Sequence, residues 1–459
     1  MVEIDNVSFS YINEENSKNL KNINLSINPG ECVLLCGASG CGKTTITKLV
    51  NGLIPHFHEG FLEGCARVDG MVVGDMPLYE LSQKAGSVFQ NPKSQFFNID
   101  SDSELAFGLE NNGVDPLIIR ERLEQVITEL KIQHLLHRNV FSMSGGEKQT
   151  LAFASVYAMN PDVYVLDEPS ANLDQEATMN LRDQIRMIKA QGKTIIVAEH
   201  RLYYLADLID RAVYIKNGSI QKEYTREEFL QIQESERHSM GLRTIFTQKC
   251  SVKEDAKDTG VLQVKNLTVK IKKKTIFENL NFSVSPGNVL GVLGHNGAGK
   301  STLLRCIAGL QKETSGEILY HGKKLNRKQR NKLCYMIMQD VNYQLFGESV
   351  WNECTISQNT EVSEEEVRQA LDEFHLLELK EKHPMALSGG QKQRLAIVTG
   401  MLAGKKILMF DEPSSGLDYE HMCRVSRNIR KLADSGCMVI VVTHDLELLN
   451  STCDQVLTF

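Results

Sequence analysis

The sequence predicts an α/β fold that occurs twice along one chain. Short β-branched runs, such as Cys32–Cys36, Val163–Leu166 and Thr194–Ala198, alternate with helical stretches, a pattern typical of a largely parallel sheet covered by helices. Several motifs of the first half recur in the same order in the second half. At 459 residues the chain is also too long for one ordinary domain, so we expect two domains of about 200 residues each.

The composition indicates a soluble globular protein and excludes several function classes. Hydrophobic residues make up 42% of the chain and charged residues 24%, with a formal net charge of −7. A negative net charge disfavours a nucleic-acid binder. No apolar run approaches the roughly 18 residues that span a bilayer, and no signal peptide is expected. The eleven cysteines show no regular spacing, so we expect reduced thiols in a cytosolic protein.

The second half repeats the motifs of the first half. The repeated stretches are GASGCGKTT (Gly37–Thr45) and GHNGAGKST (Gly294–Thr302), SGGEKQ (Ser144–Gln149) and SGGQKQ (Ser388–Gln393), and VLDEPSANLD (Val165–Asp174) and MFDEPSSGLD (Met409–Asp418). The offset between the copies is constant from the SGG motif to His200 and His444. The front of each copy varies more, as surface connections do, and the extra residues of the first copy fall around Leu53–Gly64.

The alignment of the copies also predicts the domain boundaries. Ile215 of the first copy corresponds to Phe459, the last residue of the second, so the first copy has a tail. In this tail KNGSI predicts a turn between strands, and Thr225 and Glu228 predict the capped start of a helix. A polar stretch follows. We therefore expect a first domain at 1–246, a linker at 247–260 and a second domain at 261–459.

Both GKT/S motifs match the phosphate-loop pattern G-x-x-x-x-G-K-[ST], and each follows an apolar strand and precedes a helix. The glycines let backbone N–H groups surround phosphate oxygens. Lys43 and Lys300 would neutralise β- and γ-phosphates, and Thr44 and Ser301 would offer a hydroxyl to Mg²⁺. The predicted loop residues are Gly37, Ala38, Ser39, Gly40, Cys41, Gly42, Lys43, Thr44 and Thr45, and Gly294, His295, Asn296, Gly297, Ala298, Gly299, Lys300, Ser301 and Thr302.

Carboxylates at two strand ends extend this chemistry. Asp167 and Asp411 end apolar strands, where a carboxylate can reach Mg²⁺ directly or through water. Glu168 and Glu412 follow, and a glutamate there can polarise the attacking water as a general base. A histidine at a strand end is usually structural, but His200 and His444 follow their aspartates at the same interval, which favours a γ-phosphate contact.

A second anion-binding element is predicted at two helix starts. A serine and two glycines precede a helical run in each copy, so backbone N–H groups there can face an anion. A plain helix N-cap is the alternative for either copy taken alone. The residues are Ser144, Gly145, Gly146 and Glu147, and Ser388, Gly389, Gly390 and Gln391.

Together these residues resemble ABC ATPases over nearly the whole chain, twice. The resemblance implies a P-loop NTPase fold with two tandem ABC nucleotide-binding domains, each with a parallel-rich core sheet, an antiparallel β part and a helical subdomain. It implies ATP and Mg²⁺ as cofactors. It also implies that the two domains pair within one chain, so that each SGG signature completes the other domain's ATP site. Gln90 and Gln339 fall at the family's Q-loop, which touches Mg²⁺ or the attacking water.

The stretches QNPKSQFF and NGLIPHFHEG are similar to those of energy-coupling factor (ECF) transporter ATPases. This resemblance implies ATP hydrolysis that powers uptake of a small nutrient, a vitamin or related micronutrient. The implied partners are a transmembrane coupling (T) component and a substrate-binding (S) component, with no nucleic acid, and the implied location is peripheral, at the cytoplasmic face of the membrane. Phe96, Phe97, Leu345 and Phe346 would help line a groove for the membrane partner. For the phenylalanines the alternative is a place in the core.

Two other functions fit tandem ATPases. ABC-F proteins, which act on ribosomes, resemble this arrangement but carry a long, charged helical linker, and the negative net charge disfavours RNA. A tandem sugar-importer ATPase is the third option, which the Q-loop sequence disfavours.

The two predicted sites differ from each other. The family commonly stacks an aromatic residue on adenine, and Tyr11 fits this place, whereas Ile271 stands at the matching place of the second copy. Met143 and Glu147 replace the usual leucine and glutamine of the signature. We therefore expect weaker ATP binding at the second site. For His56 and His58, a loop near the contact with the membrane partner is the favoured interpretation, and a metal site is the alternative. For Cys41, the favoured interpretation is a tolerated small residue, and redox control is the alternative.

Overall fold

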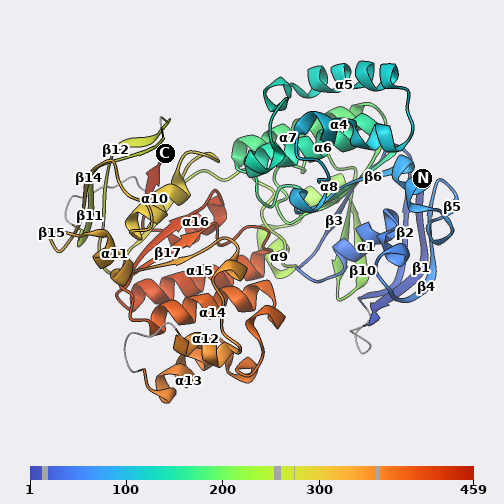
Figure 1. Ribbon diagram of the computed structural model, residues 1–459. Helices are drawn as coiled ribbons and strands as arrows, with labels where there is room; N and C mark the ends of the chain where they lie inside the picture. The colour runs from blue at the N-terminus through green and yellow to red at the C-terminus, as the bar shows by residue number, and fades with distance from the viewer. Residues whose placement is uncertain (13–18, 253–259, 273, 357–361) are drawn as a thin grey trace. The chain divides into compact units, whose positions relative to one another are not determined.

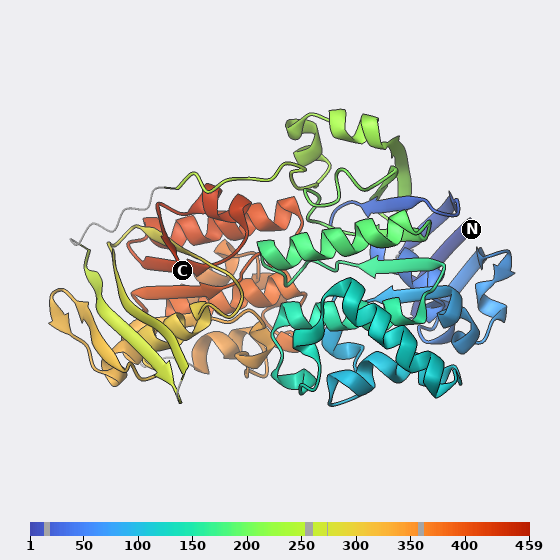
Figure 2. The same cartoon turned by 90° about the horizontal axis from the view of Figure 1, so that it is seen from above.

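The chain forms two compact units (Figures 1 and 2). Unit 1 comprises Met1–Thr247 with Gly416–Glu420, and unit 2 comprises Gln248–Ser415 with His421–Phe459. The computed structural model describes residues 1–12, 19–252, 260–272, 274–356 and 362–459. Half of the expected linker, residues 253–259, lies outside the described residues.

The central sheet of unit 1 has the strand order β10-β9-β3-β8-β7-β6 among the described residues. All neighbours are parallel except β9 and β10, which form an antiparallel hairpin. The strands are β3 (Cys32–Cys36), β6 (Ala85–Val88), β7 (Val163–Asp167), β8 (Thr194–Ala198), β9 (Arg211–Lys216) and β10 (Ser219–Thr225). β3 and β8 are buried throughout, as expected of inner parallel strands that are covered on both faces.

A second, antiparallel sheet covers one side of the central sheet. Its order is β2-β1-β4-β5, with β1 (Val2–Tyr11), β2 (Leu20–Ile27), β4 (Gly60–Val68) and β5 (Met71–Val72). From Ile23 to Ile27, alternate residues of β2 are buried, as in a strand with one face on the core. Val2 and Ile4 of β1 share a hydrophobic core with Val33 and Leu35 of β3.

The helices of unit 1 cover the sheet and form a separate helical part. α4, α5 and α6 lie together in Figure 1 and share a core that includes Leu105, Val126 and Leu151. The helices are α1 (Lys43–Val50), α2 (Leu53–His56), α3 (Leu78–Lys84), α4 (Ser101–Asn111), α5 (Pro116–Leu130), α6 (Gly145–Met159), α7 (Gln175–Ala190), α8 (Arg226–Gln231) and α9 (Glu234–Ser239).

Unit 2 repeats this architecture, which confirms the predicted fold. Its parallel sheet has the order β16-β17-β18-β13-β19, and its antiparallel sheet the order β12-β11-β14-β15. The strands are β11 (Leu262–Ile271), β12 (Lys274–Val284), β13 (Val289–Leu293), β14 (Ser315–Tyr320), β15 (Lys323–Lys324), β16 (Cys334–Ile337), β17 (Ile407–Asp411), β18 (Met438–Val442) and β19 (Gln455–Thr458). The helices are α10 (Lys300–Ile307), α11 (Arg327–Leu333), α12 (Val350–Ile356), α13 (Glu364–Glu373), α14 (Gly389–Leu402), α15 (Tyr419–Asp434) and α16 (Leu446–Thr452).

The tail of unit 1 contains the hairpin strand β10 and helices α8 and α9. In Figure 2 its yellow-green ribbon lies on the opposite side of the unit 1 sheet from the helical part. The expected capped start of α8 is confirmed: Thr225 Oγ1 accepts from Glu228 N at 3.3 Å, and Glu228 Oε2 accepts from Thr225 N at 2.9 Å. Phe229 of this helix is buried. Across the described residues, no helix is both long and apolar enough to cross a membrane.

Replacing Thr225 with alanine should loosen the tail, because the N-cap oxygen that satisfies a helix donor is lost. We expect α8 to lose about 1 kcal/mol of stability, so that amide hydrogen exchange at 226–231 rises about fivefold. Native-state exchange followed by mass spectrometry measures this effect. Thr225→Ser keeps the acceptor oxygen and should exchange like the unchanged chain; equal exchange in the alanine and serine variants would contradict the capping role.

Candidate active site

The phosphate loop of unit 1 joins β3 to α1, and that of unit 2 joins β13 to α10. The residue before each helix is a glycine with positive φ, 115° at Gly42 and 106° at Gly299. A Cβ at Gly42 would lie 2.8 Å from Leu20 Cδ2, and one at Gly299 would lie 2.6 Å from Ile276 Cγ2. Both the backbone conformation and the close packing therefore require glycine. The loop then delivers the N-terminal N–H groups of the helix to one place.

The loop lysines are buried and turn back over their own loops. Lys43 Nζ donates to Gly37 O at 3.0 Å and Ala38 O at 3.2 Å. Lys300 Nζ makes the equivalent bonds to the carbonyls of residues 294 and 295, at 2.7 and 3.1 Å. An ammonium group beside a helix N-terminus makes a strongly positive site, suited to the phosphates of a nucleotide.

Oxygen ligands that suit a divalent cation meet at the start of α1. Thr44 Oγ1 donates to Asp167 Oδ1 at 3.1 Å, from the end of β7. Burial, helped by the charge of Glu168, raises the pKa of Asp167 to about 6, although the Thr44 hydrogen bond lowers it. In unit 2 burial likewise raises the pKa of Asp411, which the Ser301 hydrogen bond opposes. Hydroxyl and carboxylate oxygens are ligands that Mg²⁺ accepts, and a cation would offset the cost of burying the carboxylate.

The glutamate after each strand has a left-handed backbone. φ is 45° at Glu168 and 50° at Glu412, a conformation that costs a non-glycine residue about 1–2 kcal/mol. The backbone N–H of each residue is fixed to the next strand, at 2.8 Å from Ala198 O and 2.9 Å from Val442 O. The turn directs the Glu168 carboxylate to Gln90, whose Nε2 donates to Glu168 Oε2 at 2.6 Å.

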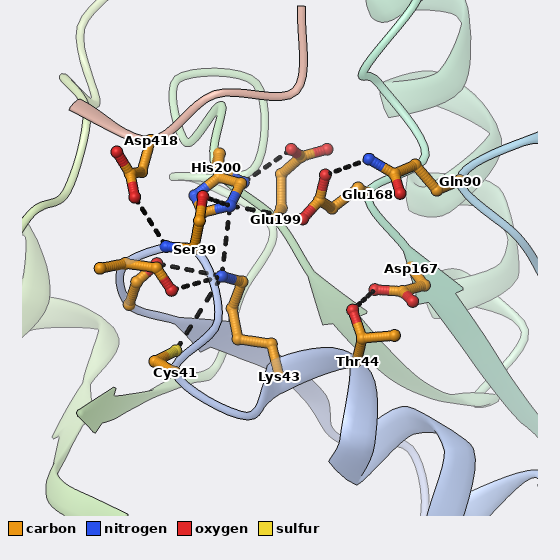
Figure 3. A network of polar contacts seen from close by, with 12 residues as sticks. Ser39, Cys41, Lys43, Thr44, Gln90, Asp167, Glu168, Glu199, His200 and Asp418 are labelled. Carbon is orange, nitrogen blue, oxygen red and sulfur yellow. Dashed lines mark hydrogen bonds and ion pairs between the residues drawn. The ribbon is translucent and has the colours of Figure 1, made fainter. Parts of the chain in front are cut away.

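The histidine after β8 joins the loop lysine and the glutamate (Figure 3). His200 Nε2 lies 3.3 Å from Lys43 Nζ and 3.4 Å from Ser39 Oγ. It also lies 3.3 Å from Glu168 Oε1. In unit 2, His444 Nδ1 lies 2.8 Å from Glu412 Oε1. The structure thus brings Lys43, Thr44, Gln90, Asp167, Glu168 and His200 together in unit 1.

The second glutamine of each Q-loop anchors the loop. Gln95 Oε1 accepts from Phe89 N at 3.3 Å, and Gln344 Oε1 accepts from Met338 N at 2.7 Å. The phenylalanines that follow are exposed, Phe97 to 76% and Phe346 to 79%.

One of the residues expected to line the partner groove is instead in the core. Leu345 is buried, so a groove role for it is wrong, and Phe96 is partly buried against the core of unit 1. The polypeptide of each Q-loop turns one apolar side chain inward and the next outward. Of the four residues predicted to line the groove, Phe97 and Phe346 are exposed.

The signature residues lie at the first turns of α6 and α14. Ser144 and Glu147 form a capping box, as do Ser388 and Gln391. Arg138 was not predicted from the sequence: its Nη1 donates to Glu147 Oε1 at 2.5 Å. Burial raises the pKa of Glu147, but the hydrogen bonds from Arg138 and Ser144 outweigh this effect and lower the pKa to about 2. The charged residue in place of the usual glutamine was the one signal that a basic neighbour would be needed.

The remaining candidate residues differ in their surroundings. Tyr11 is half-buried, with Lys48 Nζ 5.6 Å from its ring centroid and the His58 ring edge-on at 6.0 Å. Ile271 of unit 2 is 41% exposed. His56 Nε2 lies 3.1 Å from Val73 O. In the part of the chain that the structure describes, no group of three or more His, Cys, Asp or Glu side chains could hold a metal ion. Burial raises the pKa of the Cys41 thiol, which disfavours a reactive thiolate.

Comparison with known proteins identifies the family. The ABC transporter family model matches residues 20–171 and 277–415. A Treponema denticola relative, "Putative ABC transporter ATP-binding protein", is 46% identical over 465 residues, which cover 100% of this chain and 95% of the relative. The Bacillus subtilis "Putative HMP/thiamine import ATP-binding protein YkoD" is 31% identical over 493 residues, which cover 100% of this chain and 89% of that protein.

A solved structure shares the fold over almost the whole chain. It is the archaeal ribosome recycling factor aABCE1 in complex with the ribosomal stalk protein aP1, with a TM-score of 0.65 at 22% identity, covering 98% of this chain and 87% of that one. This likeness concerns the fold alone. The family model and the end-to-end relatives go further: the chain belongs to the ABC transporter family and is one of its ATP-hydrolysing members.

Proposed function

We propose that this chain is the ATPase of an ECF-type importer that takes up a small nutrient, a vitamin or a related micronutrient. The observation that carries the proposal is the relative named for HMP/thiamine import, which aligns with the entire chain at 31% identity. ABC transporter ATP-binding proteins work with membrane partners in general. Here these partners would be a T component and an S component, and the chain would bind them at the cytoplasmic face of the membrane.

In the proposed cycle, each side chain of the site has one task. Lys43 neutralises the β- and γ-phosphates, Glu168 accepts a proton from the attacking water, and His200 contacts the γ-phosphate. Bound Mg²⁺ would supply charge neutralisation, held by Thr44, Gln90 and Asp167. The second site uses the equivalent residues: Lys300, Ser301, Gln339, Asp411, Glu412 and His444. Support for these roles comes from the convergence of the unit 1 groups within hydrogen-bond reach.

We also propose that the signature of each unit completes the site of the other. A helix N-terminus binds anions through its free N–H groups and its dipole. The capping boxes of α6 and α14 fix two such termini. In this arrangement Ser388–Gln391 would close over the phosphates bound by Lys43, and Ser144–Glu147 over those bound by Lys300. Closure would be driven by ATP and released by hydrolysis.

The T component would dock on the Q-loops. Phe97 and Phe346 offer exposed aromatic surface in the same loops that carry Gln90 and Gln339. A loop that contacts the nucleotide site through one residue and a helix of the membrane partner through another can transmit a change in nucleotide state to that partner. Exposed aromatic residues are typical anchors of protein interfaces.

The adenine platform should differ between the sites. Tyr11→Ala removes a stacking surface worth about 1–3 kcal/mol, so ATP affinity at the first site should fall about 5- to 150-fold. Ile271→Tyr should raise ATP affinity at the second site, because the side chain at this position is partly exposed and an aromatic ring there could stack on adenine. Nucleotide titration in the Glu168→Gln and Glu412→Gln variants, which retain bound ATP, measures both effects. Equal affinities of the two sites before these changes would contradict the expected asymmetry.

Arg138 should be needed because Glu147 is charged. In Arg138→Ala the Glu147 carboxylate would face phosphate oxygens without its counter-charge, and ATP affinity should fall about tenfold, which corresponds to about 1.4 kcal/mol. The double variant Arg138→Ala/Glu147→Gln should restore affinity, because unit 2 already uses Gln391 without loss of its capping box. Isothermal titration with ATP measures each variant. A double variant as weak as the single one would show that Arg138 acts in another way.

The membrane partners can be identified directly. The tagged chain, expressed in its source organism and purified from detergent-solubilised membranes, should bring down two different membrane proteins in fixed ratio. Phe97→Ser/Phe346→Ser should lose them, whereas Tyr79→Ser, which changes an aromatic residue that is also 66% exposed, should keep them. Cells that lack the chain should lose ATP-dependent uptake of radiolabelled thiamine or of another vitamin. Recovery with ribosomes in place of membrane proteins would overturn the proposal in favour of the ribosomal alternative.

A further inference from the structure

The residues on either side of the site histidine differ in charge between the units. In unit 1 the order is Glu199, His200, Arg201, and in unit 2 it is Thr443, His444, Asp445. The acid therefore precedes the histidine in one unit and follows it in the other. In both units the histidine lies beside the glutamate that follows β7 or β17. The change in the position of the acid therefore lies next to the groups proposed to react.

Glu199 carries a buried carboxylate that accepts four hydrogen bonds. It is 2% exposed. Its Oε1 accepts from the backbone N–H groups of His200 at 2.7 Å and Arg201 at 3.1 Å. Its Oε2 accepts from Tyr204 Oη at 2.8 Å and from Ser170 N at 3.2 Å. Such charge-assisted bonds are stronger than neutral ones, and they join the histidine to residue 170, two positions after Glu168.

Tyr204 remains a donor to this carboxylate. Burial raises the pKa of Tyr204 well above its usual range, and the charge of Glu199 raises it further. The phenol therefore stays protonated at neutral pH. A fixed donor at this place keeps the Glu199 side chain in one orientation.

Arg201 ties the same two segments at a second point. Its side chain is buried, and Nη1 donates to Leu173 O at 2.9 Å. The segment from Glu168 to Leu173 is thus held by a backbone N–H bonded to Glu199 and by a carbonyl bonded to Arg201. Figure 3 shows Glu199 beside His200, on the side away from the phosphate loop.

Unit 2 makes the same connection from the other side of its histidine. Ser414, which corresponds to Ser170, donates from Oγ to Asp445 Oδ2 at 2.6 Å. Asp445 N donates to Thr443 Oγ1 at 3.0 Å, and Asp445 Oδ1 also caps α16. One carboxylate therefore connects the histidine segment with the segment after the glutamate in each unit, from different positions in the sequence.

We propose that Glu199 is a positioning residue of the first site, which holds His200 and Glu168 in reacting geometry, and that Asp445 does the same in the second. The proposal rests on the roles proposed above for Glu168 and His200. In this role Glu199 would act through His200, by fixing the distance between the imidazole and the Glu168 carboxylate, which is 3.3 Å in the structure. A misplacement of about 1 Å at such a site can cost about a hundredfold in rate.

The test exchanges the two patterns in the full chain. In a Glu412→Gln background, which keeps ATP binding at the second site without its general base, hydrolysis of prebound ATP reports the first site. Glu199→Thr should lower the single-turnover rate constant about 10- to 100-fold, with ATP affinity within about twofold. Glu199→Thr/Arg201→Asp, which copies unit 2, should recover most of the rate, because the new carboxylate can accept from the Ser170 hydroxyl.

Several outcomes would overturn the inference. One is a Glu199→Thr rate that is unchanged while the melting temperature falls, since the residue would then be merely structural. Another is a double variant no faster than the single one. If Glu199→Thr does not fold, Tyr204→Phe, which removes one donor, should still lower the rate severalfold without changing affinity. Asp445→Asn in a Glu168→Gln background is the parallel test in unit 2 and should slow hydrolysis at the second site.

The same assay separates this inference from the proposed function. If Glu168→Gln leaves hydrolysis at the first site intact, the role proposed for Glu168 fails and this inference fails with it. If Glu168→Gln abolishes hydrolysis and Glu199→Thr does not slow it, the inference alone is wrong.

Discussion

The candidate active site of each unit depends on three neighbouring parallel strands that end at one edge of the sheet. In unit 1 these are β7, β8 and β3, and in unit 2 they are β17, β18 and β13. Asp167 ends β7 opposite Ala198 of β8, and Leu35 of β3 pairs with the same Ala198. Adjacent strands lie roughly 4.8 Å apart, so groups far apart in sequence meet at this edge. A shift of register by one residue would turn Asp167 to the other face and separate it from Thr44.

The position at the end of β7 does not by itself determine the direction of the Glu168 side chain. Successive side chains on a strand point to opposite faces, so Glu168 would point away from Asp167 if β7 simply continued. The left-handed conformation at Glu168 and Glu412 breaks this alternation. Strain of this kind persists only where the surroundings over-determine it, and here the backbone bond to the neighbouring strand does so. This strained turn places a carboxylate beside the histidine in each unit.

Much of the fold and part of the site could be predicted from the sequence, because local patterns specify them. Glycine spacing, strand ends and the capping pair Thr225–Glu228 all depend on neighbours along the chain. The bond from Arg138 to Glu147, the backbone of Glu168 and the four donors of Glu199 could not be predicted, since each depends on residues brought together by folding. In the Q-loops no periodicity indicates which apolar side chain points inward, which is why Leu345 was assigned wrongly.

The two copies preserve contacts more closely than residues. A carboxylate joins the histidine segment to the segment after the glutamate in both units, but it comes from Glu199 in one and from Asp445 in the other. At the signature, Gln391 is neutral, whereas the charged Glu147 is paired with Arg138. A buried or half-buried charge is costly unless it is paired, so a charge gained at one position must be matched by a partner nearby. Differences at single positions between the copies therefore overstate their divergence in geometry, and substitutions in the two units are best compared as sets of contacts.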